Sequence, residues 1–147
     1  MIRAIHLDAV GGIAGDMFAA AILDAYPSLF SACEEALQAL AFDKDTKIYI
    51  EKHIDSGFKG TRFIVDDPRS KNSSSGKHVH WMEIRSFLAS APLDNAVREI
   101  AIDIFSILAK AEATVHGVSE NEVSFHEIGA VDSIIDIVIA SVLITKF

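Results

Sequence analysis

The sequence predicts an α/β fold in which a small sheet, made of one N-terminal strand and a β-hairpin, is covered by four to five helices. The strand is predicted at residues 4–8, a short and mostly apolar run. The hairpin is predicted from partial alternation over residues 47–54 and 61–66, which flank a Ser-Gly turn. Apolar side chains spaced three and four apart predict the helices. With half of its residues hydrophobic, the chain is expected to form a single domain, 1–147.

The first predicted strand leads into a glycine-rich loop. The loop contains three glycines and ends at an acidic residue (Gly11, Gly12, Gly15 and Asp16). An amphipathic helix is predicted to follow over residues 17–25. A strand, a glycine loop and a helix in this order aim backbone N–H groups at an anion. The spacing matches neither the Walker A motif nor the dinucleotide-binding fingerprint, and a plain tight turn explains the loop equally well.

Four more helices are predicted further along the chain. A short one covers residues 31–41, and a second begins at Trp81 and ends before Pro92. Asp94 is expected to cap a long third helix. The last helix contains the apolar run 137–144, which is too short to span a bilayer and therefore indicates a core helix.

A polar, serine-rich loop over residues 67–77 separates the hairpin from the second half of the chain. It ends at Lys77, which together with two other cations makes the loop locally basic. His78 and His80 follow at once. Residues two apart in an extended segment project to the same side, so both imidazoles could reach one ion. A lone His-x-His pair is only moderately specific, because surface histidines also occur at this spacing by chance.

The stretch 124–136 combines one imidazole and three carboxylates immediately before the apolar helix (His126, Glu127, Asp132 and Asp136). Asp132 and Asp136 are four apart, so they would share one helix face. Asp136 lies between two isoleucines, where an unpaired carboxylate costs several kcal/mol. A backbone amide of the glycine loop, a cation from the serine-rich loop or a metal ion could satisfy it. The stretch is therefore either a helix cap with a satisfied core Asp, or a metal site.

The potential metal ligands are of two kinds. The imidazoles suit Ni, Zn, Co or Cu, and the carboxylates suit Mg or Mn. Ligands of both kinds without a thiolate argue against a structural zinc site. The candidates are His78, His80 and His126 on one side and Asp8, Asp16, Glu127, Asp132 and Asp136 on the other.

Composition excludes several classes of function. A net charge of −8 argues against nucleic acid as the main partner, because binding a phosphate backbone requires clustered Lys and Arg. The single cysteine, Cys33, cannot form an internal disulfide, and no signal peptide precedes the first predicted strand. We therefore expect a cytoplasmic protein that binds neither nucleic acid nor membrane.

Several of these motifs, in this order, resemble the N-terminal region of the LarC family, the nickel-insertion proteins that make the nickel-pincer nucleotide cofactor of lactate racemase. The similar segments are Leu7-Asp8, residues 12–17, His78-x-His80, residues 111–118 and residues 125–138. The resemblance covers nearly the whole chain, and its most specific part is the Phe-His-Glu-Ile-Gly-Ala-Val-Asp-Ser block. The chain departs from the family pattern at Ser124, where a second histidine is common, and also at Gly12 and Ile139.

The resemblance implies a cyclometallase, a metal chelatase that places Ni(II) into pyridinium-3,5-bisthiocarboxylate mononucleotide in a CTP-dependent reaction. It also implies that the C-terminal half of the protein is absent here, and that this half, fused or made separately, binds CTP with Mg or Mn. The expected partners are thus a nucleotide-derived substrate, the C-terminal half and further copies of the chain in a homo-oligomer. The isolated domain is expected to be inactive.

The resemblance also suggests roles for the candidate residues. Nickel would be bound by His78, His80, His126 and Asp8. The bases would be Glu127, Asp132 and Asp136, and the substrate would be held by Gly11, Gly12, Gly15, Asp16 and Lys77. Three alternatives remain: a non-catalytic nickel or zinc carrier, a Mg-dependent phosphohydrolase built on Asp8 and Asp16, and a purely structural interaction domain.

Overall fold

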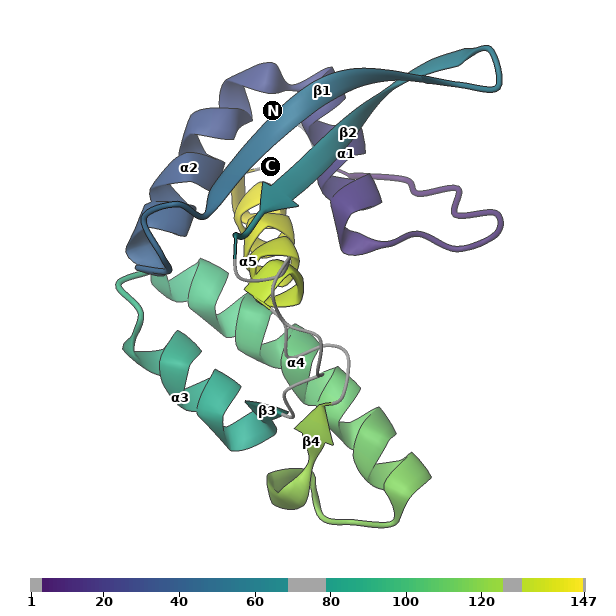
Figure 1. Cartoon of the computed structure of the whole chain (residues 1–147). Helices are drawn as coiled ribbons and strands as arrows, with labels where there is room; N and C mark the ends of the chain where they lie inside the picture. The colour runs from purple at the N-terminus through teal and green to yellow at the C-terminus, as the bar shows by residue number, and fades with distance from the viewer. Residues whose placement is uncertain (1–3, 69–78, 126–130, 147) are drawn as a thin grey trace.

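In the computed structural model the predicted hairpin and helices occur in the predicted order, whereas the predicted N-terminal strand is missing and two short strands, at residues 79–80 and 124–125, were not predicted (Figure 1). The structure describes residues 4–68, 79–125 and 131–146. In chain order the elements are α1 (Gly15–Ala25), the 3-10 helix η1 (Pro27–Leu29), α2 (Phe30–Ala39), β1 (Lys47–Asp55), β2 (Phe58–Asp66), β3 (Val79–His80), α3 (Trp81–Ser90), α4 (Asn95–His116), the 3-10 helix η3 (Glu120–Glu122), β4 (Ser124–Phe125) and α5 (Val131–Lys146). The α/β class is confirmed.

The predicted N-terminal strand is wrong. Residues 4–9 have no regular structure, and Ile5 and Leu7 are 41% and 47% exposed. A strand exists only through its hydrogen bonds to a neighbour, and none of the described strands pairs with this segment. A short apolar run alone could not reveal the missing partner.

The β-hairpin is confirmed. Strands β1 and β2 pair antiparallel in unbroken register, from Lys47 opposite Asp66 to Asp55 opposite Phe58. The two-residue turn consists of Ser56 (φ +48°) and Gly57 (φ +85°). Positive φ at both positions matches the right-handed twist of the flanking strands, which explains why a Ser-Gly pair connects them.

Helix α1 is tied to the hairpin by a polar contact. Asp24, in the last turn of α1, accepts hydrogen bonds from Lys52 Nζ (2.6 Å) and from the Thr61 hydroxyl. These bonds hold the pKa of Asp24 below its ordinary value. Beneath them, Ile48 and Phe63 of the two strands are buried in the core. The hairpin therefore fixes where α1 lies.

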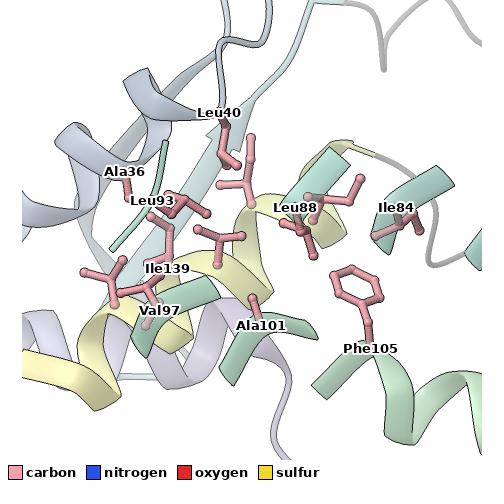
Figure 2. Packing of buried hydrophobic residues seen from close by; sticks show 14 of the residues in the cluster. Ala36, Leu40, Ile84, Leu88, Leu93, Val97, Ala101, Phe105 and Ile139 are labelled. Carbon is pink, nitrogen blue, oxygen red and sulfur yellow. The ribbon is translucent and has the colours of Figure 1, made fainter. Parts of the chain in front are cut away.

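Helix α5 lies at the centre of the core. It packs against α1, α2, α4 and β2, and Figure 1 shows it in yellow between the hairpin and α4. In Figure 2 its Ile139 lies with Leu93 and Val97. The apolar run therefore forms a core helix, as predicted. None of the helices in the described ranges is long and apolar enough to cross a membrane.

The second part of the molecule is built on α3 and α4. Ile84 and Leu88 of α3 face Phe105 and Ala101 of α4 (Figure 2). The Phe105 ring also contacts two other aromatic rings, with centroid distances of 6.2 Å to Trp81 and 6.2 Å to Phe125. One side chain thus joins α3, α4 and β4.

We expect Phe105→Ala to lower the free energy of unfolding by about 3–5 kcal/mol, because it removes a fully buried ring and leaves a cavity. Urea unfolding followed by circular dichroism measures the loss. Phe58→Ala is the matched control, since Phe58 is largely exposed at the hairpin turn. If both variants lost the same free energy of unfolding, Phe105 would not join α3, α4 and β4 as described.

Candidate functional site

The structure brings two motifs that are far apart in sequence into contact, the glycine loop and the acidic start of α5. A Cβ atom added to Gly15 would lie 3.0 Å from the Cβ of Asp136 and 3.5 Å from its Oδ2. Gly15 is the first residue of α1, and Asp136 lies in the second turn of α5. The absence of a side chain at Gly15 therefore lets the two helices approach at this point.

The glycine loop forms the turn that leads into α1. Gly11 and Gly12 have φ values of +86° and +97°, and the Gly12 N–H donates to the Ala9 carbonyl at 3.0 Å. Both backbone conformations favour glycine over residues with a Cβ. Ala14, at the N-cap position of α1, has no side-chain oxygen and makes no capping bond. The start of the helix is therefore left without a side-chain cap, next to Asp136.

Asp136 is the unusual acid of this region. Its Oδ1 is buried and has no hydrogen-bond partner among the described residues. Burial, followed by repulsion from Asp16 and Asp132, raises the pKa of Asp136 to about 7. The surrounding sequence causes this burial, because the residues on either side of Asp136 belong to a core helix. A carboxyl group with this pKa can both bind and release a proton near neutral pH.

The other two acids make ordinary local contacts. Asp132 is exposed and accepts the Ser133 N–H at 2.8 Å, and Asp16 accepts the Met17 N–H at 2.8 Å. Both bonds lie in the first turn of a helix, where a carboxylate is favoured by the helix dipole. Of the two predicted base candidates that the structure describes, Asp136 is thus the one left without a partner.

A second contact concerns the histidine motifs. Strands β3 and β4 pair antiparallel, with Val79 opposite Phe125 and His80 opposite Ser124. The Trp81 N–H donates to the Val123 carbonyl at 3.0 Å, which extends this contact to the start of α3. His80 is exposed, whereas the Ser124 hydroxyl is buried and makes no hydrogen bond within the described structure. Residues 79–80 and residues 124–125, which belong to two different sequence motifs, are therefore neighbours.

Several predicted site residues lie outside the described residues: Lys77, His78, His126 and Glu127. Asp8 is exposed in the irregular segment before the glycine turn. Within the described ranges, no three His, Cys, Asp or Glu side chains form a group that could hold a metal ion.

Cys33 is buried in the core, which raises the pKa of its thiol to about 12 and makes it a poor nucleophile.

Two features were not predicted. One is the close packing of Gly15 against Asp136; that Gly15 holds a substrate stays a prediction. The pairing of His80 with Ser124 was also missed. A glycine at the start of one helix and an acid between isoleucines in another are each visible in the sequence, but nothing in the sequence shows that they meet.

Comparison with known proteins decides the family. The family described as nickel insertion protein matches residues 5–147, almost the whole chain. The chain belongs to this family. The similarity to LarC inferred from the motifs is thereby confirmed.

Curated members of the nickel insertion family give the same result. A protein of Akkermansia muciniphila named pyridinium-3,5-bisthiocarboxylic acid mononucleotide nickel insertion protein is 38% identical over 144 residues, which are 96% of this chain and 35% of the relative. Proteins of the same name from Desulfitobacterium hafniense (strain DSM 10664 / DCB-2) and Staphylococcus epidermidis are 35% and 36% identical, over 93% and 94% of this chain and 32% and 33% of their own lengths. The chain thus spans about a third of these relatives. No solved structure matches it.

Proposed function

We propose that this chain is the N-terminal part of an enzyme that inserts Ni(II) into pyridinium-3,5-bisthiocarboxylic acid mononucleotide. Several of its relatives are named as nickel insertion proteins for this mononucleotide. The product would be the nickel-pincer cofactor of lactate racemase. CTP, with Mg or Mn, would bind to the remainder of the protein. The observation that carries the proposal is the buried carboxylate oxygen Oδ1 of Asp136, which lies beside the start of α1 and has no hydrogen-bond partner among the described residues.

The chemistry of insertion requires a base. When nickel bonds to a ring carbon, the C–H bond breaks, its electron pair forms the metal–carbon bond and a proton is released. Asp136 would accept that proton, because its pKa of about 7 keeps a large fraction ionised at neutral pH and still makes the carboxylate a better base than an exposed one. Asp132 and Asp16 would act through Asp136, since their charges help to raise its pKa.

The histidines would deliver the metal. His80 is fixed next to β4 by the two-residue pairing. His78 immediately precedes the paired residue Val79 in sequence, and His126 immediately follows Phe125. We propose that these three imidazoles present Ni(II), with Asp8 and Glu127 as further oxygen donors. The exposed Gly11–Gly12 turn and Lys77 would hold the substrate phosphate.

The test is single-turnover nickel insertion by the complete protein, with the product detected by its mass. We expect Asp136→Asn to slow insertion by about 10²–10⁴-fold, because general-base catalysis contributes about this much. Asp132→Asn is the matched control on the same helix and should slow it far less. Full activity of Asp136→Asn would refute the assignment. Stoichiometric nickel binding without any insertion, by the wild-type protein supplied with CTP, would instead indicate a metal carrier.

A further inference from the structure

Ser124 has a hydroxyl group that the described fold leaves unused. Its Oγ atom is buried and forms no hydrogen bond with any described residue. A buried polar atom without a partner is costly, so one that persists in a folded protein calls for an explanation, such as a partner that is present only when the protein works. The residues around Ser124 indicate what that partner is.

His80 lies directly opposite Ser124 in the β3–β4 pair (Figure 1). Side chains of directly opposite residues in an antiparallel pair lie on the same face, with Cβ atoms about 4.5–5.5 Å apart. The other pair, Val79 and Phe125, lies on the opposite face, where Phe125 is buried and contacts the Phe105 ring. The imidazole of His80 and the hydroxyl of Ser124 therefore share the face that points away from this aromatic contact.

Both positions are fixed by buried neighbours. Ser124 lies between Val123 and Phe125, which are 2% and 1% exposed. His80 precedes Trp81, which is 3% exposed and whose N–H donates to the Val123 carbonyl at 3.0 Å. The backbone at both residues is thus held in place. Rotation of the two side chains is then enough to form a hydrogen bond between them.

The imidazole of His80 is available for such a bond. His80 occupies the N-cap position of α3, but its side chain makes no capping bond. Within residues 4–68, 79–125 and 131–146 this imidazole makes no other hydrogen bond. A histidine that binds a metal through one ring nitrogen almost always donates the N–H of the other to an acceptor, which fixes the orientation of the ring. A serine hydroxyl can accept that bond.

We propose that Ser124 is a positioning residue for nickel binding. Its Oγ accepts a hydrogen bond from the ring N–H of His80 that does not face the metal, and so orients the imidazole toward Ni(II). This inference rests on the proposed role of His80 as a nickel donor. Imidazole suits Ni(II) better than a neutral oxygen does, so Ser124 acts through His80. The hydroxyl gains its partner only in the metal-bound state, which explains why it has none in the fold alone.

The test is calorimetric titration of the complete protein with Ni(II) alone. We expect Ser124→Ala to raise the Kd for nickel by about 10–100-fold, since loss of a group that orients a metal-binding histidine typically has this effect. Ser124→Thr retains the hydroxyl and should bind nickel like the wild type. Ser86→Ala is the matched control, because it removes an exposed hydroxyl from α3 and should leave the Kd unchanged.

Two further measurements separate this role from a structural one. Without nickel, Ser124→Ala should melt at the same temperature as the wild type or higher, because the lost hydroxyl makes no hydrogen bond with the described residues. In a His80→Ala background, Ser124→Ala should have no further effect on the Kd for nickel, since Ser124 acts through His80.

The possible failures are distinguishable. If His80→Ala weakened nickel binding but Ser124→Ala did not, or if Ser124→Ala cost as much without His80 as with it, this inference would be wrong and His80 would remain a nickel donor. A lowered melting temperature of Ser124→Ala without nickel would also overturn it, because the hydroxyl would then be structural. If His80→Ala bound nickel as tightly as the wild type, the proposed function would lose this donor and the inference would fail with it.

Discussion

Asp136→Asn is expected to raise the melting temperature by about 5–15 °C at pH 8, and by progressively less as the pH falls toward 4. The pKa of Asp136 is raised from 3.8 to about 7 in the folded protein. Below pH 4 the carboxyl is protonated in both the folded and the unfolded states, and folding carries no penalty. As the pH rises toward 7 the unfolded state loses the proton while the folded state retains it, so stability falls. Above pH 7 the penalty is complete.

The size of this effect follows from the shift. One pKa unit corresponds to 1.36 kcal/mol, and Asp136 retains partial contact with solvent, so we expect about 2–4 kcal/mol of destabilisation in the wild type at pH 8. The neutral asparagine removes it. Glu99→Gln is the control, because Glu99 is exposed on α4. Thermal melts at several pH values compare the melting temperatures of the wild type, Asp136→Asn and Glu99→Gln. A difference between Asp136→Asn and wild type that does not depend on pH would contradict the raised pKa.

Gly15→Ala is expected to destabilise the protein by about 1–3 kcal/mol, although alanine favours a helix more than glycine does by about 1 kcal/mol. The new methyl group would lie 3.0 Å from the Cβ of Asp136, so α1 and α5 would have to separate. Separation would admit water to the carboxyl and lower its pKa toward the ordinary value. The variant should therefore be less stable and also show a smaller loss of stability between pH 4 and pH 8.

Gly60→Ala is the matched control for this prediction. A Cβ at Gly60, in β2, would meet nothing within 4 Å. Urea unfolding at pH 6 measures how much each of the variants Gly15→Ala and Gly60→Ala changes the free energy of unfolding. If the Gly15 and Gly60 variants were equally stable, the close contact between α1 and α5 would not exist as described.

Much of the fold could be predicted because local signals agreed with the tertiary structure. The Ser56–Gly57 turn has two positive φ angles, and the alternating residues on either side of it pair with each other. The final helix was predicted from its apolar run. The N-terminal segment failed because Ile5 and Leu7 look like strand residues, whereas a strand also requires a partner that no local pattern reveals.

The candidate site was predictable only in part. The sequence showed that Asp136 lies among isoleucines and needs a partner, and within the described residues its buried Oδ1 has none. It could not show that Gly15 meets Asp136, because the contact depends on how α1 and α5 pack across the core. The pairing of His80 with Ser124 likewise depends on the aromatic cluster around Phe105, which positions β4 and α3 together.

The most direct measurement is an NMR titration of the Asp136 side-chain carboxyl carbon between pH 3 and pH 9, assigned by comparison with Asp136→Asn. We expect a midpoint near 7, because burial and then repulsion from Asp16 and Asp132 raise the pKa of this carboxyl. A midpoint near 4, typical of an exposed aspartate, would contradict both the buried carboxyl and its proposed role as the base.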